Sequence, residues 1–138
     1  VYKISYGYAA GEYLLIENRQ PIDLDFDQSL WTGGILIYHI DENAFTGGAV
    51  GNQPRGGPFQ EGWPQNGNHY PVALLQADGL YELEQALNGG HANDFWLTAS
   101  QTLRPGTGQF PNTDSYAFGN VVPTGLTIDN FVEFDAAG

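Results

Sequence analysis

The stretch Gly33–Glu42, GGILIYHIDE, decides the fold class together with Gly11–Gln20, GEYLLIENRQ. Both are short apolar runs rich in Leu, Ile and Tyr, and both end in polar residues. Runs of this length and composition, bounded by glycine, are typical of buried strands rather than helices. The pattern predicts strands at Glu12–Asn18 and Ile35–Ile40, with their polar ends available to solvent, a metal ion or a partner domain.

Working outward, a weakly alternating segment at Val1–Tyr8 predicts a first strand that forms a hairpin with the second through a tight turn at Ala9–Gly11. The apolar run in Pro71–Gln76 predicts a fourth strand that is buried on both faces. Further strands are expected later in the chain, at Phe95–Leu97, Tyr116–Phe118 and Leu126–Phe134.

A single helix is predicted, at Asp78–Gly89. Asp78 has the side chain of a helix N-cap, and Gly89 supplies a left-handed stop. Between them, Leu80, Leu83 and Leu87 fall on one helical face.

Composition supports a single all-β domain over residues 1–138. The chain has 138 residues, including 19 Gly and 8 Pro, which favours many turns and long loops. The longest loop is expected at Asn43–Tyr70, and a loop of that length is usually functional. We therefore expect a jelly-roll-like β-sandwich with one short helix.

The net charge of −12 at pH 7 comes from 16 acidic and 4 basic residues. It argues against partners with a polyanionic surface, namely nucleic acid and anionic membranes. It fits a secreted protein that binds cations, and it fits equally well a solvated acidic surface. The chain has no cysteine and no methionine. It also contains no signal peptide and no run long enough to span a membrane, so we expect a piece of a longer exported precursor.

Several segments carry a family resemblance. In order and spacing, the chain resembles the region downstream of the catalytic centre in M6-family secreted metallopeptidases of the immune inhibitor A type, roughly from Val1 to Phe134. The segments that carry the resemblance are EYLLIENRQ (12–20), GILIYHIDE (34–42), VALLQADG (72–79), FPNT with SY (110–116) and TGLTIDNF (124–131). The resemblance implies that the parent is a zinc peptidase whose catalytic domain is a partner of this chain.

No catalytic machinery is recognised in the chain itself. The three histidines, His39, His69 and His91, are isolated, and none lies in the H-E-x-x-H frame of zinc peptidases. The family carries that motif upstream, so no zinc is expected here. G-x-S-x-G, a P-loop and a cysteine nucleophile are also missing from the sequence. The sequence therefore predicts a non-enzymatic chain.

The strongest positive prediction is a calcium site, because calcium binds oxygens of Asp, Asn and main-chain carbonyls. The expected ligands flank the predicted helix: Asp78 before it, and Asn88, Asn93 and Asp94 after it. A helix of this size separates its ends by roughly 15 Å, so Asp78 and Asp94 meet only if residues 89–93 fold back. The family pattern there is Gly-Asp-x-Gly-Asp, whereas this chain reads GHAND (90–94). The alternative is purely structural, with Asp78 as a cap and Asn93–Asp94 in a turn.

Other polar groups in the sequence fit a binding site less well. Asp23, Asp25 and Asp27 begin like an EF-hand loop, but the required Gly and Glu at its sixth and twelfth positions are absent. For Glu17 and Arg19 we expect a structural ion pair. His39, near Asp41, is expected to lie on a strand with its ring hydrogen-bonded within the protein, rather than to bind a metal.

Two functions fit these observations. The first is an accessory β-domain of a secreted M6-like peptidase. The second is a released module that self-assembles into homo-oligomers or filaments, with divalent cations favouring assembly. In the second case the exposed sheet edges would be Val1–Tyr8 and Leu126–Phe134.

Overall fold

The computed structural model describes residues 1–21, 29–30, 32–47, 70–106, 111–117 and 120–132. Within these ranges every strand pairing is antiparallel. The strands are β1 (Tyr2–Ile4), β2 (Glu12–Arg19), β3 (Gly34–Asp41), β4 (Val72–Leu74), β5 (Thr102–Leu103) and β6 (Ile128–Asp129), and the short 3₁₀ helices are η2 (Glu42–Gly47) and η3 (Ala92–Asp94). The expectation of an antiparallel, β-rich chain is confirmed.

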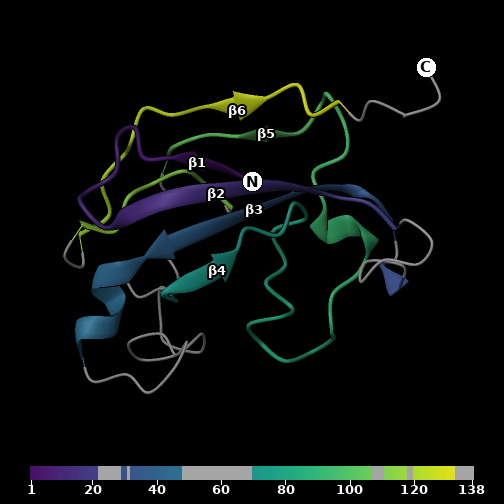
Figure 1. The fold of residues 1–138 in the computed structure, drawn as a ribbon, viewed down its shortest axis with the longest axis horizontal. Helices are drawn as coiled ribbons and strands as arrows, with labels where there is room; N and C mark the ends of the chain where they lie inside the picture. Colours follow the sequence, from purple (N-terminus) through teal and green to yellow (C-terminus); the bar gives the residue numbers. More distant parts are fainter. Residues whose placement is uncertain (22–28, 31, 48–69, 107–110, 118–119, 133–138) are drawn as a thin grey trace.

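The two stretches that decided the fold class form the centre of the main sheet, whose strand order is β1-β2-β3-β4 (Figure 1). β2 and β3 pair along their whole length, from Glu12 opposite Asp41 to Arg19 opposite Gly34. Because side chains alternate across a strand, Leu14 and Ile37 turn their side chains to one face of this pair and are fully buried there. The predicted strands at Glu12–Asn18 and Ile35–Ile40 are therefore confirmed; the first extends to Arg19, and the second gains a residue at each end.

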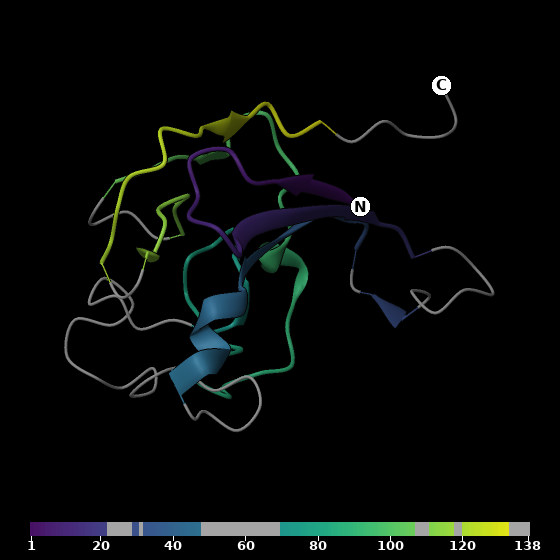
Figure 2. The ribbon, with the colours of Figure 1, turned by 60° about the vertical axis from the view of Figure 1, so that its left-hand side comes forward.

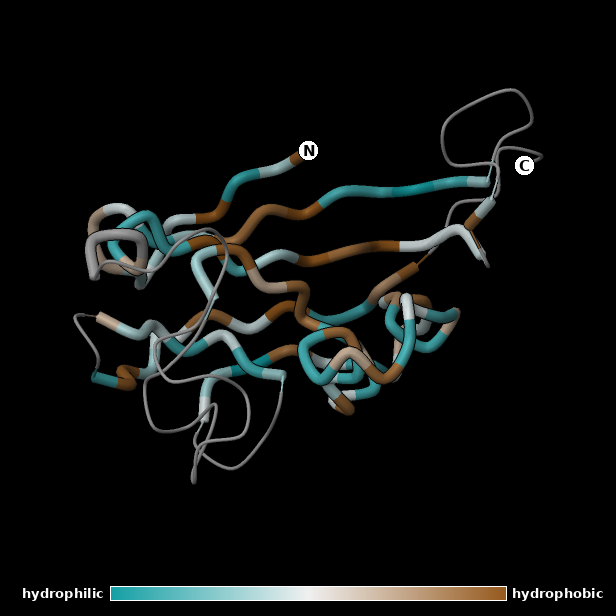
Figure 3. Tube along the Cα trace, turned by 90° about the horizontal axis from the view of Figure 1, so that it is seen from below, coloured by the Kyte–Doolittle hydropathy of each residue, from teal (hydrophilic) through white to brown (hydrophobic). Residues whose placement is uncertain are grey.

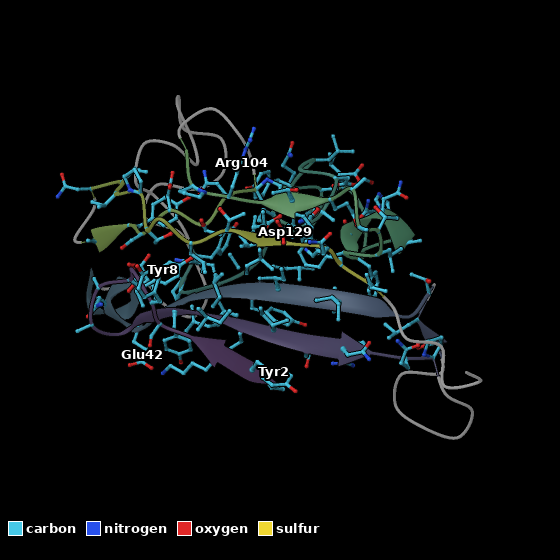
Figure 4. The ribbon with its side chains drawn as sticks, turned by 90° about the horizontal axis from the view of Figure 1, so that it is seen from above. Tyr2, Tyr8, Glu42, Arg104 and Asp129 are labelled. Atoms are coloured by element: carbon cyan, nitrogen blue, oxygen red, sulfur yellow. The ribbon has the colours of Figure 1, made fainter. Side chains whose placement is uncertain are left out.

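A second layer covers that face. β5 and β6 form their own small sheet and lie above the four-stranded sheet in Figure 4. The core between them contains Leu14, Ile37, Leu75, Trp96, Leu103 and Phe131. The Trp96 and Phe131 rings lie 4.9 Å apart between centroids, a separation typical of favourable aromatic pairs. Figure 3 shows the hydrophobic segments following the strands through the middle of the molecule.

The predicted strands need correction in two places, at the first hairpin and at residues 95–103. β1 and β2 do form an antiparallel pair, but the connection runs over residues 5–11 rather than through a tight turn. Gly7 explains part of this path, since its φ is +80° and a Cβ there would lie 2.3 Å from the Thr124 carbonyl oxygen. The sequence does not predict β5, a strand of two residues, which is too short to give a periodic pattern. At Phe95–Leu97 only Trp96 bridges to a strand, at Ile35.

β4 is shorter than the predicted strand at Pro71–Gln76 and is not buried on both faces. Its first residue, Val72, is 40% exposed. Among the described residues, β4 is an outer strand of the sheet and pairs with β3 alone. An outer strand with one neighbour leaves side chains open to solvent, whereas the sequence pattern alone resembled that of a central strand.

The helix predicted at Asp78–Gly89 is wrong. The segment forms turns, and Tyr81 and Ala86 adopt positive φ angles of 53° and 54°, which interrupt a right-handed helix. The stripe of leucines does not face the core, since Leu80 is 57% exposed and Leu87 is 67% exposed. The buried amide of Gln76 replaces regular helical bonding here, as its Oε1 accepts from the Glu82 N–H at 3.1 Å.

Some predicted features fall outside the described residues. These are the aspartates at 23, 25 and 27, most of the long loop at Asn43–Tyr70 with His69, and the ends of the last two predicted strands. At the start of that loop, residues 42–47 form η2, which continues from the end of β3 on the side away from β6 (Figure 2). Within the described ranges, no helix has the length and apolar character needed to cross a membrane.

A buried carboxylate joins the sheet to the C-terminal part of the chain. Glu12, 2% exposed, accepts hydrogen bonds from the Ser115 hydroxyl and from the Tyr116 N–H at 2.7 Å. Its Oε1 also lies 2.8 Å from Nε2 of His39 on β3. The His39 ring packs between Tyr8 and Tyr116, with centroid distances of 5.9 and 5.4 Å. The carboxylate thus ties segments together that are more than one hundred residues apart.

We expect Glu12→Ala to lower the free energy of unfolding by about 3–5 kcal/mol, because it strips several buried polar groups of their partner at once. The matched control is Glu42→Ala. Glu42 is exposed and accepts from the Tyr13 hydroxyl at 3.1 Å, so its loss is expected to cost less than about 1 kcal/mol. Urea denaturation of both variants measures the difference, and equal losses would contradict the role given to Glu12.

Candidate metal centre

The loop after β4 returns to the sheet, which brings Asp78 and Asp94 together. The Ala77 N–H donates to the Asp94 carbonyl at 3.1 Å. Two residues further on, Trp96 exchanges backbone hydrogen bonds with Ile35 of β3 and donates its indole N–H to the Leu75 carbonyl at 2.9 Å. The two ends of the loop are therefore anchored side by side by main-chain bonds. The fold-back on which the predicted site depended is present.

η3 fixes the geometry of the second half of the site. Oδ2 of Asp94 accepts from the His91 N–H at 2.7 Å, and the Asp94 N–H donates back to the His91 carbonyl at 3.1 Å. Gly90 precedes this turn with φ +99°, a conformation that other residues rarely adopt. The short turn therefore places the His91 ring and the free Asp94 oxygen on the same side, facing Asp78.

The side chains of Asp78, His91 and Asp94 form a cluster whose ligand atoms, one from each residue, lie within 4.8 Å of one another. Nε2 of His91 is 3.7 Å from Oδ2 of Asp78, and Nδ1 of His91 is 3.8 Å from Oδ1 of Asp94. These distances are too long for hydrogen bonds. Nε2 already bonds to Glu82, whereas the Nδ1–Oδ1 distance is close to the separation of two atoms that share one metal ion.

Three atoms of this cluster are buried without a hydrogen-bond partner among the described residues: Asp78 Oδ2, His91 Nδ1 and Asp94 Oδ1. The Asp94 side chain is only 4% exposed, so water does not compensate freely. Buried polar atoms are nearly always satisfied in folded proteins, and three unsatisfied atoms within one cluster need an explanation. A cation bound in the cluster would give them a partner.

The electrostatics of the cluster are dominated by carboxylates. The hydrogen bond from His91 Nε2 to Oε2 of Glu82, at 2.7 Å, raises the pKa of His91. Partial burial opposes that rise, and the charges of Asp94, Glu82 and Asp78 add to it. Nearby, burial raises the pKa of Glu84, while hydrogen bonds, including one from the Gln76 amide at 2.6 Å, partly counteract that effect. The site concentrates negative charge that a cation would neutralise.

Of the four predicted ligands, the structure brings two together. Asn88 is occupied elsewhere, donating to Oε2 of Glu82 at 2.9 Å and accepting from the Gly90 N–H at 2.8 Å. Asn93 is exposed on η3. Instead, the structure adds His91 to the cluster and Glu82 behind it. The sequence had marked His91 only as a departure from an acidic family pattern. The sequence feature that could have indicated its role is its position three residues before Asp94, directly after two glycines.

The ion pair and the satisfied histidine expected from the sequence are both present. Nη1 of Arg19 lies 3.2 Å from Oε1 of Glu17, which also accepts from the Tyr38 hydroxyl at 2.9 Å. His39 is buried against Glu12. These contacts support the structural interpretation of both.

A second polar cluster has the composition of a hydrolytic triad but the wrong order. Ser115, His39 and Glu12 lie together, and Glu12 is the middle member, since both the serine hydroxyl and Nε2 of the histidine bond to it. A triad needs the histidine in the middle to take the proton from the nucleophile. All three residues are also buried. The arrangement is suited to holding the fold rather than to catalysis.

No family model, curated protein sequence or solved structure matches this chain.

Proposed function

We propose that this chain is a non-catalytic β-domain that binds one divalent cation at Asp78, His91 and Asp94, and that it serves as an accessory domain of a secreted M6-like metallopeptidase. The observation that carries the proposal is the group of unpartnered buried atoms on these three residues. A cation held there would lock the loop 76–94 against the sheet. The cation stabilises only the folded form, because the ligands come from both ends of the loop.

The accessory role draws on the family resemblance, on the lack of H-E-x-x-H and on the β-rich fold. In this proposal the two sheets form a β-sandwich with long loops, and the missing partner is the catalytic domain of the parent enzyme. Calcium is the cation that the sequence predicted. Carboxylate oxygens of Asp78 and Asp94 suit it, with main-chain carbonyls and water completing the six to eight ligands it takes.

Adding calcium or zinc to metal-free protein is expected to raise the melting temperature. The stabilisation should be about 2.7 kcal/mol when the free cation is a hundredfold above its Kd. Asp78→Asn keeps the Oδ1 that accepts from the Leu80 N–H at 3.0 Å, but loses the unpartnered oxygen, so its melting temperature should respond much less. Differential scanning calorimetry in a chelator, calcium or zinc makes the comparison. No rise with either cation would refute the proposed site.

The pure chain is expected to leave casein intact, since the sequence supplies neither a zinc peptidase motif nor a cysteine nucleophile. Gel analysis after prolonged incubation is the measurement. Cleavage that a zinc chelator stops would contradict the accessory role.

A second candidate function, self-association, has one structural observation in its favour. β1 is an outer strand of its sheet, and beside it Val1, Tyr2 and Tyr6 are 83%, 77% and 72% exposed. An outer strand with free backbone groups and exposed aromatic side chains can pair with another copy.

Under this alternative, sedimentation velocity at high concentration should show oligomers that Tyr2→Lys weakens, because a charge at the outer strand disfavours pairing. Val122→Lys is the matched control, as Val122 is 43% exposed but lies outside the strands. A single monomeric species, with and without calcium, would leave the accessory domain as the function.

A further inference from the structure

We infer that the cation site selects a zinc-class transition metal over calcium, through Nδ1 of His91, which Glu82 orients from behind. This inference rests on the proposed cation site and specifies which ion it holds. It also reverses the expectation of a zinc-free chain. That expectation concerned catalytic zinc in an H-E-x-x-H motif, whereas the ion inferred here would hold a loop.

The hydrogen bond between His91 and Glu82 fixes the orientation of the imidazole ring. Nε2 of His91 lies 2.7 Å from the Glu82 carboxylate, which can only accept, so Nε2 carries the proton. In the neutral ring Nδ1 then has a free lone pair. Nδ1 is buried and has no partner among the described residues, and it faces Oδ1 of Asp94 at 3.8 Å. Two acceptors that face each other need a cation between them.

A protonated His91 does not satisfy the cluster equally well. Its Nδ1 would lie 3.8 Å from Oδ1 of Asp94, a donor–acceptor distance too long for a hydrogen bond. Ligands of a single zinc ion lie about 2.0–2.2 Å from the metal, which places two of them roughly 3.3–3.6 Å apart at a tetrahedral angle. The observed separation exceeds this by only a few tenths of an ångström.

The donor set decides the metal class. Calcium takes oxygen ligands almost entirely, and in the part of the chain that the structure describes the cluster combines two carboxylates, Asp78 and Asp94, with the imidazole of His91. An imidazole nitrogen with carboxylates suits zinc and its neighbours in the first transition row. The three protein ligands leave a fourth tetrahedral position for water.

Glu82 completes a carboxylate–histidine–metal arrangement, in which the outer carboxylate fixes the tautomer and strengthens the ligand. Asn88 in turn donates to the same Glu82 oxygen at 2.9 Å. Glu82 is therefore a positioning residue that acts through His91. Asn88, which the sequence predicted as a ligand, instead holds Glu82 in place through this hydrogen bond.

The test measures the affinities of zinc and calcium for the metal-free chain by competition with a chromophoric chelator, and the visible spectrum after cobalt is added. Wild type should bind zinc more tightly than calcium and give the cobalt absorption of a site with nitrogen and oxygen ligands. His91→Asp should reverse the preference, because it makes the set all-oxygen. Asp129→Asn, an exposed substitution outside the site, should change neither affinity.

Glu82→Gln should weaken zinc binding by about 10–100-fold in the wild-type background. In the His91→Asp background the same change should leave calcium binding nearly unaltered, because there is no imidazole left to orient. An equal loss in both backgrounds would show that Glu82 acts through the fold rather than through His91. Calcium bound as tightly as zinc by wild type would overturn the inferred selectivity while leaving the cation site intact. Binding of neither ion would overturn both.

Discussion

The buried carboxylate of Glu12 is the constraint on which the rest of the structure depends. It sits at the start of β2 and is only 2% exposed. A carboxylate in that position is tolerated only when hydrogen bonds surround it. His39, Ser115 and Tyr116 supply them, and two of these come from the far end of the chain. The need to satisfy one charge thus fixes where the C-terminal segment crosses the sheet.

That crossing in turn shapes the core. Once residues 115–116 are docked, Thr113 bonds to the Leu126 carbonyl at 2.7 Å and Tyr8 bonds to the Thr113 carbonyl at 2.9 Å. The chain beyond then runs back over the sheet, bringing β6 beside β5 and Phe131 against Trp96 (Figure 4). Trp96 also anchors the end of the loop that carries the candidate metal centre. The core and the site therefore share one side chain, and loosening the core at Trp96 would move Asp94.

The two buried polar clusters differ in how fully the protein satisfies their carboxylate oxygens. Around Glu12, every carboxylate oxygen has a donor from the protein itself. Around Asp78 and Asp94, one oxygen of each has a main-chain donor, and the other oxygen faces the His91 ring without one. A cluster that is fully satisfied has no need of a ligand. A cluster left half satisfied in a chain of net charge −12 has a physical reason to take up a cation.

The sequence by itself determined that residues 12–18 and 35–40 are strands and that the chain is β-rich, because short apolar runs bounded by glycine are local signals. The pairing of these two strands came from the tertiary structure. The sequence also predicted that Asp78 and Asp94 meet if the loop between them folds back, and the structure brings them together. The tertiary structure decided the rest. The leucine spacing after Asp78 favoured a helix, but the buried Gln76 amide captured the Glu82 N–H and the segment became turns. His91, rather than Asn88 or Asn93, lies beside Asp78 and Asp94 because the return of the chain is set by the Ala77–Asp94 and Trp96–Ile35 bonds. Such long-range contacts leave no periodic trace in sequence.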